Sequence, residues 1–286
     1  MQVLVTGAQG FLGKYICKNL SKTMDVIETD INDMDITDSK TVNKRFSSFN
    51  PNFLVHLAAI SDAQNSLDDP PRYFEDNYLG TLNLLEACRN NGIQRFVFMS
   101  SLTVYGRSAS EVDENDSICP QHPYSGSKAA CEILVRTYNK AFNIPAVILR
   151  PNLISGPGNN PNDLIFSFVN EITKSGKVEI FGSGLHQRQW THPDDVALAV
   201  RDALLMINED FHIINLGSNK MTVRDLAKTV VLELGKGEIS YSDKSRQAFS
   251  LVCSTKKAEL VLGWRPQIGI KEIIRQHANN LKKSET

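Results

Sequence analysis

The chain has 286 residues, of which 41% are hydrophobic and 22% are charged, and its formal net charge is −1. These values are typical of a globular protein with one large domain or two fused ones. The near-neutral charge argues against a nucleic-acid partner, and the absence of a long apolar run argues against a membrane-spanning segment.

The five cysteines and six histidines are scattered along the chain. No two cysteines stand at the spacing of metal ligands, so no metal site is expected. An odd number of dispersed cysteines favours reduced thiols over disulfides, and we therefore expect a cytoplasmic location.

Short apolar runs alternate with amphipathic stretches in the first half of the chain. The pattern predicts strands at 3–5, 26–27, 53–56, 95–100 and 146–150. It predicts helices at 11–20, about 73–89 and about 123–141. Strands that alternate with helices imply crossover connections, so we expect an α/β fold with a doubly wound parallel sheet.

The texture changes after Pro151, where a loop cluster rich in Gly, Pro and Asn covers 156–162. Shorter mixed elements follow, including helices that begin near Pro193 and Thr222. We predict a nucleotide-binding domain with the catalytic residues at 1–151. Residues 152–286 are predicted to form mainly a smaller α/β substrate lobe, with a possible return of the chain to the sheet.

A glycine-rich loop, Gly7-Ala8-Gln9-Gly10-Phe11-Leu12-Gly13, follows the first predicted strand and opens a helix. The three glycines permit a tight turn, a close approach of the backbone to a pyrophosphate, and packing of the helix on the strand. Asp30 ends the second strand and can accept hydrogen bonds from ribose hydroxyls, while it would repel a 2′-phosphate. The loop therefore predicts a Rossmann-type dinucleotide site, and Asp30 favours NAD over NADP.

Tyr124 and Lys128 stand four residues apart on a predicted helix and would share one face. A lysine cation near the tyrosine is expected to lower its pKa and make it a proton acceptor at neutral pH. Ser101 follows a predicted strand and can bond the same substrate oxygen. This trio predicts proton transfer at an alcohol oxygen while hydride moves at the adjacent carbon.

Taken together, these motifs resemble the extended short-chain dehydrogenase/reductase family, in its NAD-dependent epimerase/dehydratase branch that acts on nucleotide-sugars. The resemblance implies that Ser101, Tyr124 and Lys128 are catalytic. It implies further cofactor contacts from Asp35, Ile36, Leu57, Ala58, Ala59 and Asn77. It implies that Arg188 and Arg246 bind the diphosphate of a nucleotide-diphosphate sugar, for which a guanidinium fork is suited. The segment Leu262-Gly263-Trp264-Arg265-Pro266 matches a late family signature that we interpret as structural.

Departures from the family pattern narrow the reaction. Leu102 and Thr103 stand where family dehydratases carry Asp-Glu, and neither the glutamate of decarboxylases nor the cysteine of fucose-type epimerase-reductases is present. The segment 102–106 is closest to the 4-epimerase form. Leu153 replaces a usual asparagine, with Asn152 one residue early, and the segment around Arg246 is altered.

We therefore expect an NAD-dependent nucleotide-sugar 4-epimerase that works through a 4-keto intermediate. A 4-keto-sugar reductase or dehydrogenase of the same family is the alternative, and a non-catalytic dinucleotide-binding protein is a third hypothesis. The resemblance also implies a homodimer, joined through the helices predicted at about 73–89 and 123–141.

Overall fold

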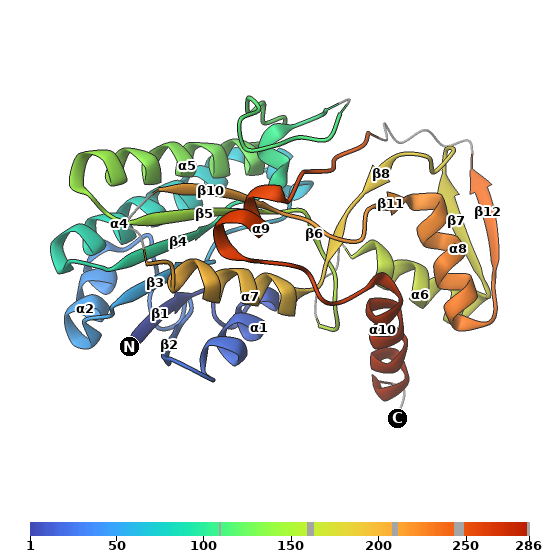
Figure 1. Ribbon diagram of the computed structural model, residues 1–286, viewed down its shortest axis with the longest axis horizontal. Helices are drawn as coiled ribbons and strands as arrows, with labels where there is room; N and C mark the ends of the chain where they lie inside the picture. Colours follow the sequence, from blue (N-terminus) through green and yellow to red (C-terminus); the bar gives the residue numbers. More distant parts are fainter. Residues whose placement is uncertain (109, 159–162, 208–210, 243–248, 285–286) are drawn as a thin grey trace.

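A six-stranded parallel sheet forms the centre of the larger lobe in the computed structural model (Figure 1), which describes residues 1–108, 110–158, 163–207, 211–242 and 249–284. The strand order is β10-β5-β4-β3-β1-β2, and every neighbouring pair is parallel. The strands are β1 (Gln2–Thr6), β2 (Asp25–Thr29), β3 (Phe53–His56), β4 (Arg95–Met99), β5 (Ala146–Pro151) and β10 (His212–Leu216). The predicted α/β fold with a doubly wound parallel sheet is confirmed.

Helices cover both faces of this sheet (Figure 1), because each face carries large apolar side chains that must be buried. One face is covered by α2 (Ser39–Phe49), α4 (Gly80–Asn91) and α5 (Pro123–Phe142). The other face is covered by α1 (Phe11–Leu20), α7 (Pro193–Leu204) and α9 (Lys256–Leu262). All residues of β3 and β4 are buried, as expected for central strands of a doubly covered sheet.

The helix predicted at about 73–89 consists of three consecutive segments. They are α3 (Pro70–Phe74), a π-helical turn η2 (Glu75–Leu79) and α4. A π turn inserts an extra residue into the helical ladder and is often found at functional sites. Gly80 directly after it lets the helix approach Ile36, whose Cγ1 would lie 2.6 Å from a Cβ at this position.

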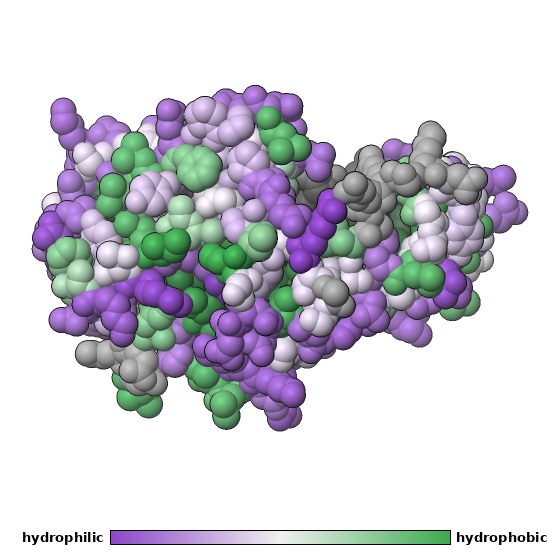
Figure 2. Space-filling view, turned by 90° about the horizontal axis from the view of Figure 1, so that it is seen from above, coloured by the Kyte–Doolittle hydropathy of each residue, from purple (hydrophilic) through white to green (hydrophobic). Residues whose placement is uncertain are grey.

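The smaller lobe surrounds a separate apolar core built from α6, α8, α10 and the β7–β12 pair. These elements are α6 (Leu164–Ser175), β7 (Lys177–Phe181), α8 (Val223–Leu234), β12 (Glu238–Ser242) and α10 (Ile270–Ser284). Two short pairs join the lobes: parallel β6 (Leu153–Ile154) with β9 (Trp190–Thr191), and antiparallel β8 (Gln187–Arg188) with β11 (Met221–Thr222). The surface narrows between the two lobes (Figure 2).

Residues after Pro151 contribute to both lobes, because α7, β10 and α9 belong to the layers of the large sheet. Trp264 fixes the last return of the chain. Its side chain is 2% exposed, and its Nε1 donates to the Asp195 carbonyl at 2.7 Å. The Asp195 carboxylate in turn accepts from the backbone N–H groups of Gln267 and Ile268 at 2.9 and 3.1 Å. The Leu-Gly-Trp-x-Pro segment thus has a structural role.

Within the described residues, no helix is long and apolar enough to cross a membrane. The same residues contain no group of three or more His, Cys, Asp or Glu side chains arranged to hold a metal ion.

Candidate active site

A cavity of about 980 Å³ opens at the carboxyl ends of the sheet strands. It lies where β1 and β3 are neighbours and the strand order reverses, which is where open α/β sheets bind ligands. Its wall is formed by the glycine loop, by the segments that follow β2 to β5, and by the start of α6. The volume suits a large organic ligand such as a dinucleotide with a second molecule beside it.

The predicted glycine loop forms one end of this cavity. Gly7 has φ +69° and packs so closely on the segment after β3 that a Cβ would lie 2.8 Å from Ala58 N. A Cβ on Gly13 would lie 2.6 Å from Ala8 O. Helix α1 begins after Gly10 with no side-chain cap and no acidic residue in its first turn, so its N–H groups face the cavity. Such an uncapped N-terminus attracts a pyrophosphate.

Two acidic residues beyond β2 line the neighbouring part of the cavity. Asp30 is oriented by the N–H groups of Gln9 and Ile31, at 3.1 and 2.8 Å. Asp35 accepts from both the N–H and the hydroxyl of Thr37, at 2.9 and 2.7 Å. A fixed carboxylate at the end of the second strand is what an adenosine ribose needs, so these residues fit an NAD molecule.

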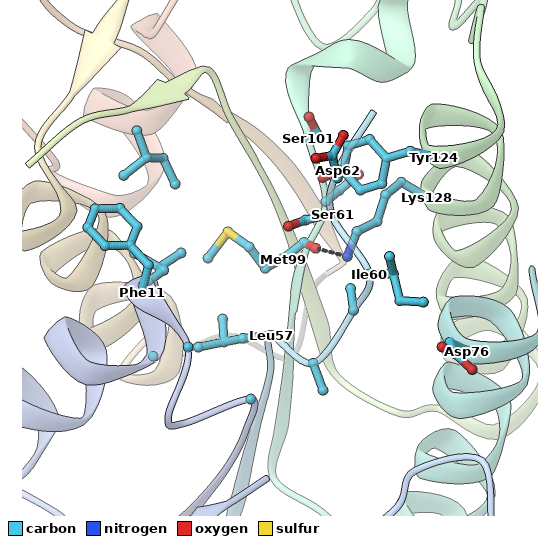
Figure 3. A pocket seen from close by; sticks show the side chains of 18 of the residues that line it. Phe11, Leu57, Ile60, Ser61, Asp62, Asp76, Met99, Ser101, Tyr124 and Lys128 are labelled. Carbon is cyan, nitrogen blue, oxygen red and sulfur yellow. Dashed lines mark hydrogen bonds between the residues drawn. The ribbon is translucent and has the colours of Figure 1, made fainter. Parts of the chain in front are cut away.

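At the other end of the cavity, Lys128 is buried in the wall beneath β4 (Figure 3). Its Nζ donates to the Met99 carbonyl at 2.9 Å and lies 4.9 Å from the centre of the Phe98 ring. Burial lowers the Lys128 pKa to about 8, against a smaller raising effect of Cys131 and Glu132.

Tyr124 stands one helical turn before Lys128, and its ring faces the same cavity as Ser101 (Figure 3). Ser101 caps the turn η3 (Leu102–Tyr105), and its Oγ accepts from the N–H and the hydroxyl of Thr103 at 3.2 and 2.9 Å. The structure therefore brings Ser101, Tyr124 and Lys128 to one cavity with the glycine loop.

The Tyr124 pKa differs from the sequence-based expectation. Burial raises it to about 12, and the hydrogen bond with Ser101 lowers it by less than burial raises it. The expectation of a lowered value was wrong for this structure, because the ammonium of Lys128 is held against Met99 and burial is the larger effect.

A buried ion pair lies behind these groups. Glu132 on α5 and Arg150 on β5 form two contacts, 2.9 Å from Nε and 2.5 Å from Nη2, and both side chains are about 4% exposed. Ser100 donates to Glu132 at 2.5 Å, and Arg150 donates to the Tyr105 hydroxyl at 2.6 Å. This network ties the end of β4 and the turn η3 to the helix that carries Tyr124 and Lys128.

Asn77 does not line the cavity. Its Oδ1 accepts from Ile60 N at 2.8 Å, and its Nδ2 donates to the Ile60 carbonyl and to Ser127 Oγ at 3.1 and 2.9 Å. The other residues that the resemblance assigned to the cofactor do line the cavity: Asp35, Ile36, Leu57, Ala58 and Ala59. Asn77 instead fixes the loop after β3 to α5, which carries Tyr124.

The predicted diphosphate ligands lie in the smaller lobe. Arg188 is outside the described cavity lining, donates to the Phe249 carbonyl, and stacks over the Phe249 ring at 4.7 Å. Burial lowers its pKa to about 10. Arg246 lies outside the described residues. Asn152, the asparagine one residue before Leu153, lines the cavity, and its Nδ2 donates to Gln189 Oε1 and to the Leu251 carbonyl at 3.1 and 3.0 Å.

Sequence reasoning missed several polar residues that line the cavity. They are Ser61, Asp62, Arg72, Asp76 and Thr103. Ser61 and Asp62 lie in an irregular segment, Arg72 lies in α3 and Asp76 lies in η2, and no fingerprint marks any of the four as a site residue. Thr103 was identified from the sequence only as a departure from the dehydratase pattern. In the structure its hydroxyl donates to Ser101 Oγ, so it belongs to the site.

The sequence model of the NAD dependent epimerase/dehydratase family matches residues 3–217. The chain belongs to this family. It is therefore an enzyme of the isomerase or oxidoreductase type, and NAD is its cofactor.

Relatives in this family catalyse more than one reaction. A Methanocaldococcus jannaschii protein, provisionally named UDP-glucose 4-epimerase, is 34% identical over 307 residues, and the match covers 99% of both chains. The dTDP-D-glucose 4,6-dehydratase of Dictyostelium discoideum is 30% identical over 267 residues, with 80% of this chain and 61% of that protein covered. The crystal structure of Thermus thermophilus UDP-glucose 4-epimerase with NAD is 29% identical, with a TM-score of 0.86 over 99% of both chains.

Proposed function

We propose that this enzyme is an NAD-dependent nucleotide-sugar 4-epimerase. The observation that carries the proposal is the meeting of Ser101, Tyr124 and Lys128 in one cavity with the glycine loop. The names of the Methanocaldococcus jannaschii and Thermus thermophilus relatives support a uridine diphosphate sugar as substrate.

In the proposed reaction, Tyr124 removes the proton of the sugar 4-hydroxyl, and Ser101 hydrogen-bonds the same oxygen. Bound NAD supplies the chemistry of hydride removal from C4 and its return. Lys128, whose Nζ donates to the Met99 carbonyl, would hold the nicotinamide ribose. The ketone formed at C4 turns over in the cavity, and Tyr124 returns the proton to the oxygen of the inverted centre.

The cofactor would be held by the glycine loop at its pyrophosphate and by Asp30 and Asp35 at its adenosine half. Further cofactor contacts are proposed from Phe11, Leu12, Ile36, Leu57, Ala58 and Ala59. Arg188 and Arg246 remain proposed ligands of the sugar-nucleotide diphosphate, and Asn77 a proposed support of the cofactor loop. Residues 1–151 would thus bind mainly the cofactor and 152–286 mainly the substrate.

The residues after Ser101 favour epimerisation over elimination of water. Leu102 is 1% exposed and packs in an apolar cluster, while Thr103 donates to Ser101. Positions 102 and 103 therefore carry no carboxylate of the kind that family dehydratases use there. A 4-keto-sugar reductase is less well supported, because biosynthetic reductases often use NADPH and Asp30 disfavours its 2′-phosphate.

Turnover without added cofactor tests this proposal. Protein purified with bound NAD should interconvert UDP-glucose and UDP-galactose with no net absorbance change at 340 nm. Stoichiometric consumption of NADH with a keto-sugar would overturn it in favour of the reductase. Tyr124→Phe should lose at least 100-fold in kcat and retain NAD binding, in line with general acid–base contributions of about 10²–10⁴. A wild type that binds NAD without any turnover, and a Tyr124→Phe variant that behaves identically, would favour a non-catalytic dinucleotide-binding protein.

We further propose a homodimer that forms through α5 and the α3–η2 segment. Exposed apolar side chains lie on both: Phe74, Tyr78, Leu79, Ile133 and Phe142. Figure 2, which looks onto the α5 side, shows hydrophobic side chains among the polar ones of the larger lobe. Sedimentation of the wild type and of Ile133→Asp would test the proposal, since a monomeric wild type contradicts it.

All five cysteines are free, which supports a reducing, cytoplasmic location.

A further inference from the structure

The hydroxyl of Ser101 receives two hydrogen bonds from a single neighbour, Thr103. Both residues line the cavity, and Ser101 Oγ lies 3.2 Å from Thr103 N and 2.9 Å from Thr103 Oγ1, each of which donates to it. A serine hydroxyl has two lone pairs to accept with and one hydrogen to donate. Thr103 therefore fills both acceptor positions of Ser101 and leaves it only its hydrogen.

The remaining hydrogen of Ser101 is directed to Tyr124. Figure 3 shows the Ser101 side chain next to the Tyr124 ring, and the two hydroxyls are hydrogen-bonded. Burial is the larger effect on the Tyr124 pKa and raises it, whereas the bond with Ser101 lowers it. A hydrogen bond lowers the pKa of an acid when it is donated to the charged form. Ser101 is thus a donor toward the oxygen of Tyr124, as expected when Thr103 occupies its lone pairs.

The local fold accounts for only one of the two bonds from Thr103. Ser101 caps the turn η3, and such a cap needs only the bond from the backbone N–H of Thr103. The turn is already fixed by the burial of Leu102, Val104 and Tyr105, which are 1%, 0% and 3% exposed. The second bond, from the Thr103 hydroxyl, is additional to the cap. A threonine side chain has few rotamers, so this hydroxyl is held in place.

This arrangement has a consequence for a sugar whose C4 hydroxyl reacts beside Ser101 and Tyr124. The C4 hydroxyl has one proton, which it can give to either neighbour if both can accept. Ser101 cannot accept it while Thr103 fills its lone pairs, so Tyr124 is the acceptor of this pair. Ser101 instead donates to the C4 oxygen, both in the alcohol and in the ketone, which can only accept.

We propose that Thr103 is a positioning residue that holds Ser101 as a hydrogen-bond donor and so directs the proton of the sugar C4 hydroxyl to Tyr124. This inference rests on the proposed function, because it takes Tyr124 as the group that receives this proton. The competing explanation is that Thr103 only stabilises the turn η3.

Thr103→Val tests the proposal, because it removes the hydroxyl and keeps the backbone N–H that the cap needs. With UDP-galactose and NAD-loaded protein, kcat should fall about tenfold while KM stays within about twofold, since the lost bond orients the proton and does not bind the sugar. Thr103→Ser retains a hydroxyl and should keep kcat within about threefold of the wild type. Thr229→Val removes a hydroxyl that donates to the Asp225 carbonyl on α8, outside the cavity lining, and should leave kcat unchanged.

The pH dependence of kcat/KM distinguishes positioning from stabilisation of the turn. Without the Thr103 hydroxyl, Ser101 is free to rotate away from Tyr124, so the Tyr124 pKa should rise. The acidic limb of the profile should therefore move to higher pH in Thr103→Val and stay in place in Thr103→Ser. A defect in the turn alone would lower the Tm and leave the position of this limb unchanged.

A wild-type kcat in Thr103→Val would overturn the inference. A fall in kcat without the shift of the acidic limb, or without recovery in Thr103→Ser, would also overturn it and support the stabilising role. Each rate is followed as epimer formed and as NADH formed. If the wild type oxidises UDP-galactose without epimerising it, the proposed function fails, and the inference stands if Thr103→Val shows the expected defect. No conversion of UDP-galactose or UDP-glucose by the wild type overturns both.

Discussion

Gly13→Ala tests whether the close packing of the glycine loop is what permits NAD binding. A Cβ at this position would lie 2.6 Å from Ala8 O and closer still to Gly7 O. Ordinary Cβ contacts are 3.4–4 Å, so the backbone of α1 or of the loop must move by at least about 0.8 Å. Both partners are main-chain atoms, which cannot rotate away as a flexible side chain could.

Overpacking of this kind costs about 3 kcal/mol. For a chain of this size that corresponds to a fall in Tm of about 6–12 °C. The same displacement moves the N–H groups at the start of α1, so NAD affinity should fall by at least about tenfold. Differential scanning fluorimetry without cofactor and isothermal titration with NAD measure the two effects separately.

Two other glycines calibrate the result. A Cβ on Gly10 would lie 3.2 Å from Gly7 O, and a Cβ on Gly269 would have no atom within 4 Å. Gly10→Ala should therefore have an intermediate effect on the free energy of unfolding without cofactor, and Gly269→Ala should change it by less than about 1 kcal/mol. If Gly13→Ala binds NAD as tightly as the wild type does, the steric reasoning is refuted. It is also refuted if Gly269→Ala lowers the Tm more than Gly13→Ala does.

Three further predictions concern charged groups. A lysine is charged below its pKa, and the pKa of Lys128 is about 8. If the charged form supports turnover, kcat should fall as the pH rises through about 8. A kcat that stays constant up to about pH 9.5 would contradict this prediction. Glu132→Gln leaves Arg150 with an uncompensated buried charge and should cost about 3 kcal/mol in urea unfolding, whereas Glu86→Gln, which breaks a half-exposed pair, should cost less than about 1 kcal/mol. Asp30→Asn should reduce the preference for NAD over NADP by at least about tenfold in titration, since it removes the charge that repels a 2′-phosphate.

The elements that could be predicted from the sequence are those determined by local patterns. Helix α1 was predicted with its observed bounds, because an apolar stripe begins directly after a glycine turn. The π turn η2 was not predicted, because it depends on how Asn77 and Gly80 fit against the loop after β3 and against Ile36, which are distant in sequence.

The residues of the candidate site also differ in whether a local pattern or a distant contact brings them together. Tyr124 and Lys128 share a helix, so their meeting could be inferred from spacing alone. Asp62 lines the same cavity as Tyr124, and its backbone is held by a hydrogen bond from Tyr73, eleven residues away on another element, which no local pattern encodes. Asn77 was predicted to contact the cofactor, but in the structure its side chain bonds the backbone of Ile60 and the hydroxyl of Ser127, contacts that depend on how α5 packs against the loop after β3.

The Tyr124 pKa depends on the three-dimensional surroundings of the phenol and not only on the spacing between Tyr124 and Lys128. Residues four apart on a helix lie on one face, and from this the sequence suggests that the lysine charge acts on the phenol. In the structure Lys128 donates to the Met99 carbonyl, and burial raises the Tyr124 pKa to about 12. The phenol is therefore protonated at neutral pH in the protein alone. In the proposed reaction Tyr124 acts as a proton acceptor, and a positive charge brought to this end of the cavity by bound NAD would lower its pKa toward that role. The acid–base group would then become competent when the hydride acceptor is in place, which couples the two halves of the proposed reaction.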